Sequence, residues 1–88
     1  MMTMETRIQL RKILNLWDPL NIVKDNIFDE YDAYVDNILI ELRKGSDVIS
    51  ITDLLTQIVT LDMEIRPDLK RERTTAESLI KWYKLQIQ

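Results

Sequence analysis

Asp29, Asp32 and Asp36 are the residues whose type and spacing come nearest to a chemical site. They lie at positions i, i+3 and i+7, which places three carboxylates on one face of a helix. Carboxylate oxygens are the ligands that Mg²⁺ and Ca²⁺ prefer, so a hard-cation site is one interpretation. Such a site needs ligands that converge from a loop or from several elements, whereas one helix presents them in a diverging row. The sequence therefore favours a solvated acidic face, and it predicts no metal and no cofactor.

The other reactive side chains lack the partners that catalysis needs. The 88 residues include no His and no Cys, which removes the usual general base near neutral pH, thiolate chemistry and disulfides. Ser46, Ser50 and Ser78 have no nucleophile elbow around them. The single glycine, Gly45, excludes a Gly-rich phosphate loop. We predict that the protein is not an enzyme; a small metal-dependent enzyme, marked by chelator-sensitive activity, is the remaining catalytic alternative.

Two tyrosines flank the acidic series. Tyr31 and Tyr34 fall on or near the apolar stripe of the same predicted helix, so packing is the default interpretation. Aromatic rings beside acids can also form a protein-binding hot spot, in which the rings are buried and the acids meet a cationic partner. We therefore predict a surface that binds a basic protein, with these candidate residues: Asp29, Glu30, Tyr31, Asp32, Tyr34 and Asp36.

Charge is unevenly distributed along the chain. The net charge of -3 disfavours nonspecific binding to nucleic acid or to anionic membranes. Residues 18–36 carry six acids against Lys24 alone, whereas residues 66–84 carry six bases against three acids. The run KRER at 70–73 has no interleaved aromatic residues, so it is predicted to be a solvated face. No apolar run approaches the ~20 residues that span a bilayer, and residues 1–12 do not resemble a secretory signal, so we expect a cytoplasmic protein.

Hydrophobic periodicity predicts the helices that must position these residues. Helical spacing predicts a first helix over residues 3–16, a second over 28–44 and a last over 68–85. A third helix lies between the last two; Ser50 or Thr52 is its predicted cap, and residues 63–67 close it. Pro19 ends the first helix, Gly45 caps the second, and Asp68 is the N-cap candidate of the last. The third segment is rich in β-branched residues, so a strand is the alternative there. The sequence predicts one all-α domain over residues 1–88, a compact bundle of about four amphipathic helices.

The connection between the first two helices carries its own signals. Trp17 at a helix end is predicted to cover the core, and the Asp18 side chain to brace the turn before Pro19. A linker follows over residues 20–27. Its apolar residues are expected to turn inward, because an exposed run of this kind is unusual: Leu20, Ile22, Val23 and Ile27.

The first half of the chain also resembles a known family. The resemblance is carried by Trp17-Asp18-Pro19, then Asp29-Glu30-Tyr31-Asp32, then Tyr34, Ile38, Leu42 and Gly45. Small bacterial helical proteins of about this length share this "WDP … DEYD … G" signature. The second half is similar only in helix layout, and LNIV at 20–23 replaces the small residues that usually follow the proline. The resemblance implies a small α-helical domain and no established activity.

A second likeness is one of size and charge. Small acidic helical proteins of bacteria often serve as immunity proteins, which bind and neutralise a toxin, commonly a cationic nuclease. The resemblance implies that proteins with this signature include immunity proteins of contact-dependent growth inhibition systems. We therefore predict a protein-binding module, and most specifically an immunity protein whose partner is a basic toxin domain. The alternative is a homo-oligomeric or regulatory helical module without a toxin partner.

Overall fold

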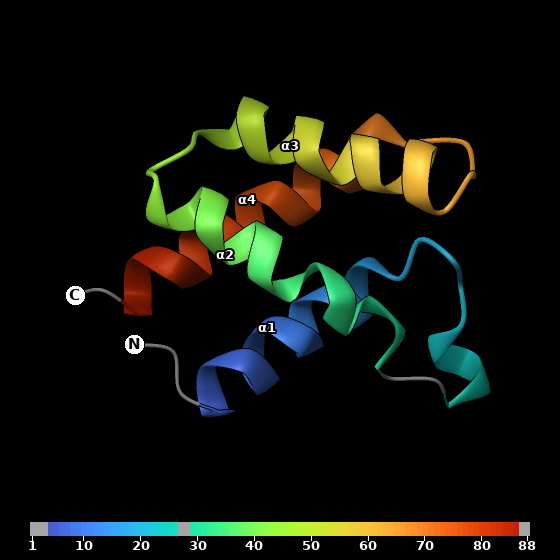
Figure 1. The fold of residues 1–88 in the computed structure, drawn as a ribbon, viewed down its shortest axis with the longest axis horizontal. Helices are drawn as coiled ribbons and strands as arrows, with labels where there is room; N and C mark the ends of the chain where they lie inside the picture. The colour runs from blue at the N-terminus through green and yellow to red at the C-terminus, as the bar shows by residue number, and fades with distance from the viewer. Residues whose placement is uncertain (1–3, 27–28, 87–88) are drawn as a thin grey trace.

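Four α-helices, joined by shorter helical segments, appear in a computed structural model that describes residues 4–26 and 29–86 (Figure 1). The α-helices are α1 (Met4–Trp17), α2 (Val35–Arg43), α3 (Val48–Gln57) and α4 (Leu69–Gln86). Two 3₁₀ segments, η1 (Val23–Asp25) and η2 (Glu30–Tyr34), precede α2, and a π-helical segment, η3 (Ile58–Asp62), continues α3. The described part of the chain contains no strand, which confirms the predicted all-α class.

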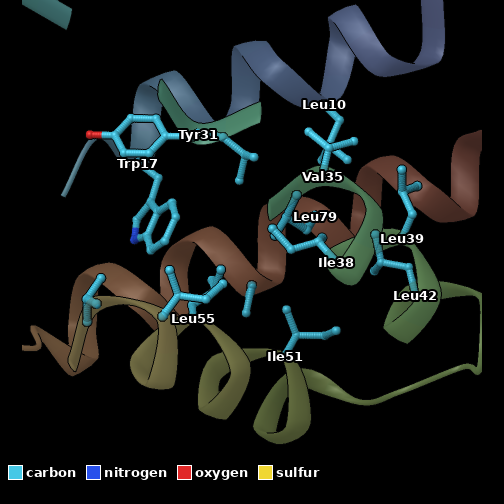
Figure 2. Packing of buried hydrophobic residues seen from close by; sticks show 14 residues of the cluster. Leu10, Trp17, Tyr31, Val35, Ile38, Leu39, Leu42, Ile51, Leu55 and Leu79 are labelled. Atoms are coloured by element: carbon cyan, nitrogen blue, oxygen red, sulfur yellow. The ribbon is translucent and has the colours of Figure 1, made fainter. Parts of the chain in front are cut away.

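The helices enclose one core. In Figure 1, α3 lies along α4, α1 lies on the other side of the molecule, and α2 crosses between them. The radius of gyration is 12.3 Å, close to the ~12 Å expected for a compact chain of this length. Every helix contributes to the cluster drawn in Figure 2, whose buried members are Leu10, Leu14, Trp17, Tyr31, Val35, Ile38, Leu39, Leu42, Ile51, Leu55, Ile58, Val59, Ala76 and Leu79. Among the described residues, no helix is long and apolar enough to cross a membrane.

The second helix is shorter than its apolar stripe predicts. The stripe suggested a helix over residues 28–44, but residues 30–34 form the tighter η2 turn and α2 begins only at Val35. The side chains of η2 are held by α1 and the turn after it: Tyr31 bonds to Asp18 and Asp32 to Arg11. These contacts fix a segment that would otherwise continue α2 toward its N-terminus. Ile27 and Phe28 lie outside the described residues.

The third helix begins earlier than predicted, and its cap is a different residue. The expectation of Ser50 or Thr52 as cap was wrong, because Asp47 has extended backbone and its Oδ1 accepts the Ser50 N–H at 2.9 Å. The segment is helical and not a strand. One of its β-branched residues, Thr56, donates its hydroxyl to the Thr52 carbonyl one turn earlier at 2.8 Å.

Three predicted helix ends are confirmed. Gly45 has φ +78°, donates its N–H to Leu42 O, and is followed by the Ser46 N–H donating to Glu41 O, which is a Schellman ending. Asp68 caps α4 by accepting the Arg71 N–H on Oδ1 at 3.1 Å. The first helix ends at Trp17, directly before the Asp18-Pro19 pair. Thr3, the first residue of the predicted helix over residues 3–16, lies outside the described residues.

Candidate functional site

The turn after α1 is organised by the Asp18 carboxylate. Asp18 has a positive φ of +38°, which aspartate tolerates better than most residues, and the proline after it disfavours the right-handed helical region. Its Oδ1 accepts the Ile22 N–H at 2.9 Å and its Oδ2 accepts the Val23 N–H at 3.2 Å. The prediction that Asp18 braces this turn is confirmed. Leu20, Ile22 and Val23 are half-buried, and the first two pack against the core as expected; Ile27 lies outside the described residues.

Tyr31 joins this turn to η2. Its hydroxyl donates to Asp18 Oδ1 at 2.6 Å and accepts the Leu20 N–H at 3.1 Å. Its ring lies 5.8 Å from the Trp17 ring (Figure 2). Burial, reinforced by the hydrogen bond to Asp18, raises the pKa of Tyr31. Burial also pushes the pKa of Asp18 upward, but the donors around it outweigh this and lower that pKa overall.

The residues of the "WDP" and "DEYD" stretches are therefore largely structural. Tyr31 is only 1% exposed, so its ring offers no accessible surface to a partner. Its packing interpretation is the one that the structure supports. Asp18 and Tyr31 couple the end of α1 to the segment that leads into α2, through an ionised carboxylate and a neutral hydroxyl.

Two of the candidate acids pair with arginines of α1. Asp32 accepts both Nε and Nη2 of Arg11, with Nε–Oδ1 at 3.0 Å, and Asp36 accepts Arg7 Nη1 at 2.6 Å. The hydrogen bonds that Arg11 donates to Asp32, followed by the charge of that carboxylate, raise the pKa of Arg11. The Asp36 side chain is 71% exposed and that of Asp32 only 34%. Both pairs hold η2 and α2 against α1, so these carboxylates are partly neutralised within the protein.

The remaining candidates lie at or near the surface, and one of them, Tyr34, has an acid from another segment nearby. Asp29 and Glu30 are exposed, and Tyr34 is half-buried. Burial raises the pKa of Tyr34, and the nearby charges of Asp62, from η3, and Glu30 add to the rise. We call Asp29, Glu30, Tyr34 and Asp62 the acidic patch. Sequence reasoning missed Asp62; its only signal was an acidic residue at the end of the otherwise apolar face of the third helix.

The arrangement suits the recognition of cations on a partner better than the chelation of a metal ion. Within residues 4–26 and 29–86, no three acidic side chains are grouped so that they could hold a metal. Asp32 and Asp36 direct oxygens toward arginines, and Asp29 acts on Arg11 through its charge without an ion pair to it. The acidic patch can attract lysine or arginine side chains, for which Tyr34 supplies an aromatic surface.

Glu72 corrects the predicted solvated face at 70–73. Its side chain is 0% exposed, although the rest of that run is exposed or half-buried. Oε1 accepts the Trp17 indole N–H at 2.9 Å and Arg71 Nε at 2.6 Å, while Oε2 accepts the Asp68 N–H at 2.6 Å. These donors satisfy a carboxylate that could not otherwise be buried. The prediction that Trp17 covers the core is confirmed, since it is 4% exposed.

Comparisons of this chain with protein-family models, with curated proteins and with solved structures find no match.

Proposed function

We propose that this protein binds a basic partner protein through the acidic patch, and that the partner is a toxin domain which it neutralises as an immunity protein. The observation that carries the proposal is which acidic side chains are paired with an arginine or lysine and which are not. Asp29, Glu30 and Asp62 form no ion pair within the described residues, whereas Asp32 and Asp36 do. The patch therefore combines Asp62 with the residues of the predicted surface whose charge is still available to a partner.

The physical basis is electrostatic attraction followed by burial of an aromatic ring. Opposite charge on two proteins accelerates their encounter, and the acceleration is lost as salt screens it. The net charge of -3 acts in the same direction over longer distances. Tyr34 then provides apolar area that is already partly shielded from water, the kind of residue that forms the centre of an interface. Asp36 lies on the same predicted surface and can exchange Arg7 for a partner's cation.

The test begins with capture of the tagged protein from cells that produce it, followed by identification of what is bound. We expect one stoichiometric basic protein that is toxic when expressed alone and harmless when this chain is expressed with it. The charge-reversal variant Glu30→Lys/Asp62→Lys should weaken binding to that protein at least about 100-fold and abolish protection. The matched control, Glu5→Lys/Asp53→Lys, changes the charge equally at exposed positions outside the patch.

Unchanged affinity in the patch variant, or equal loss in the control, would refute the proposed surface. Recovery of the protein alone, together with a mass in solution that rises with concentration, would favour the homo-oligomeric module instead. A captured partner that is not toxic would retain the binding function and refute the immunity role.

A further inference from the structure

The last turn of the third helix is wider than the turns before it. The Ile58 N–H still donates to Leu54 O, four residues earlier, whereas the Met63 N–H donates to Ile58 O, five residues earlier, at 3.0 Å. This is the π-helical pattern of η3, which continues α3 without a break. Such turns are rare in helices and are frequent at functional sites. Compared with a regular α-helix, η3 therefore holds one additional residue in its turn.

The additional residue decides which side chain follows Ile58 on the apolar face of the helix. In a regular α-helix it would be Asp62, at i+4 from Ile58 and i+7 from Leu55, both of which are buried. In η3 the residue one turn after Ile58 is Met63, which packs against the core, and Asp62 is exposed. The wider turn thus removes a carboxylate from the buried face and leaves it at the surface, near Tyr34.

The cost of burying charge explains why the chain adopts this pattern. A carboxylate needs a paired cation or several hydrogen-bond donors before it can leave water, and none of the ion pairs within the described residues includes Asp62. Methionine is apolar and flexible, so Met63 occupies the same place on the core without that cost. An apolar residue at position 62 would lift the restriction, and the commoner α-helical pattern should then bury it.

We propose that the charge of Asp62 holds the end of α3 in the π-helical pattern, and that this pattern places the acid where the acidic patch uses it. The importance of that place rests on the proposed function, since a partner must recognise the patch. The pattern itself belongs to the free protein and can be tested without any partner. It follows that the position of this charge, and not only its presence, contributes to recognition.

The first test follows the free protein by NMR, with the methionine methyl groups selectively labelled. In Asp62→Leu we expect the introduced leucine to replace Met63 on the core, so that the Met63 methyl signal shifts toward that of Met4, which is 75% exposed. Asp62→Lys is the matched control: its side chain is charged and equally costly to bury, so the Met63 signal should keep its position. An unchanged Met63 signal in Asp62→Leu, or an equal shift in Asp62→Lys, would overturn the proposal.

A deletion tests the additional residue, and it does not require that Asp62→Leu folds. Removing Thr60, which is exposed in η3, should leave a regular α-helical turn with Met63 still on the core, so cooperative unfolding in urea should persist. Removing Thr74 is the control, because this exposed threonine lies among buried residues of the regular helix α4. That deletion rotates the two halves of the buried face apart and should abolish cooperative unfolding. Loss of cooperative unfolding in both deletions would overturn the proposal.

The binding test uses the partner captured with this protein. In the regular α-helical pattern expected with leucine at position 62, position 61 lies at i+3 from Ile58, beside the apolar face, and position 60 lies on the opposite side. Leu61→Asp/Asp62→Leu should therefore retain most of the affinity, whereas Thr60→Asp/Asp62→Leu, with the same net charge, should bind at least about tenfold more weakly. Equal affinity of the two double variants would overturn the proposal. Unchanged affinity in Glu30→Lys/Asp62→Lys would instead refute the acidic patch itself, so the two failures are distinguishable.

Discussion

Trp17 and Asp18 are adjacent in the chain, yet their side chains reach two very different carboxylate clusters. The Trp17 indole donates to Glu72, 55 positions later in α4, and the Asp18 carboxylate accepts the hydroxyl of Tyr31, 13 positions later in η2. The first cluster is centred on a fully buried acid, and the second on an acid in a half-buried turn. The end of α1 thus contacts both α4 and η2 through side-chain hydrogen bonds. The difference in burial between the two clusters should decide how strongly each one stabilises the fold.

The largest effect is expected at the buried cluster. Glu72→Ala removes the acceptor of the Trp17 N–H and the Asp68 N–H, and it leaves the charge of Arg71 without its carboxylate. Breaking one side of a buried ion pair lowers the free energy of unfolding by about 3–5 kcal/mol. Urea unfolding followed by far-UV circular dichroism measures this loss.

The control for this variant is Glu77→Ala, one turn further along α4. The Glu77 side chain is 59% exposed and lies 3.9 Å from Arg73, so its removal should cost no more than about 0.5 kcal/mol. Similar losses in the two variants would contradict the buried role of Glu72. Glu72→Gln sharpens the assignment, because an amide can accept the indole N–H but cannot neutralise Arg71, and its effect should be intermediate.

The next effect is expected at the Asp18 cluster. Tyr31→Phe keeps the ring in the core but removes the donor to Asp18 and the acceptor of the Leu20 N–H. Loss of these hydrogen bonds should lower the free energy of unfolding by about 1–2 kcal/mol. Tyr34→Phe is the control, because it removes a hydroxyl from a half-buried ring beside Glu30 and Asp62. An equal loss in both variants would show that the bond to Asp18 contributes nothing of its own.

The same cluster predicts a pH dependence. Because the pKa of Asp18 in the folded protein lies below the ordinary 3.8, its stabilisation is complete above that value and is lost as the pH falls through the folded pKa. The stability advantage of the natural protein over Asp18→Asn should therefore persist at neutral pH and shrink in acid. Urea unfolding of both proteins along an acidic pH series measures it. Asp25→Asn, the same loss of charge at an exposed position of the same connection, is the matched control.

The sequence predicts the Asp18 side of this comparison well because its contacts are local. A proline after Asp18 dictates the turn, and side-chain acceptors close to turn N–H groups need no distant partner. Gly45 and Asp68 are predictable for the same reason. The packing role of Tyr31 follows from the apolar stripe, although its hydrogen bond to Asp18 does not.

The Glu72 side could not be predicted from its own neighbours. A charged run such as 70–73 is usually solvated. Glu72 is buried because it contacts Trp17, which comes from α1. The spacing of Asp68 and Glu72 resembles a capping box lengthened by one residue, which was the available signal. Asp62 joins Tyr34 in the acidic patch through tertiary packing, so the patch could be predicted only in part.

The smallest effects are expected where carboxylates pair at the surface of α1. The Arg7–Asp36 pair has side chains 40% and 71% exposed, against 42% and 34% for Arg11–Asp32, which is also bidentate. Solvent and salt screen an exposed pair more strongly than a shielded one. Arg7→Ala should therefore change stability less than Arg11→Ala, and both should change it less than Tyr31→Phe. Added salt should reduce the Arg7 effect first. An Arg7→Ala loss as large as that of Glu72→Ala would mean that charge pairing, and not burial, sets the strength of the contacts around α1.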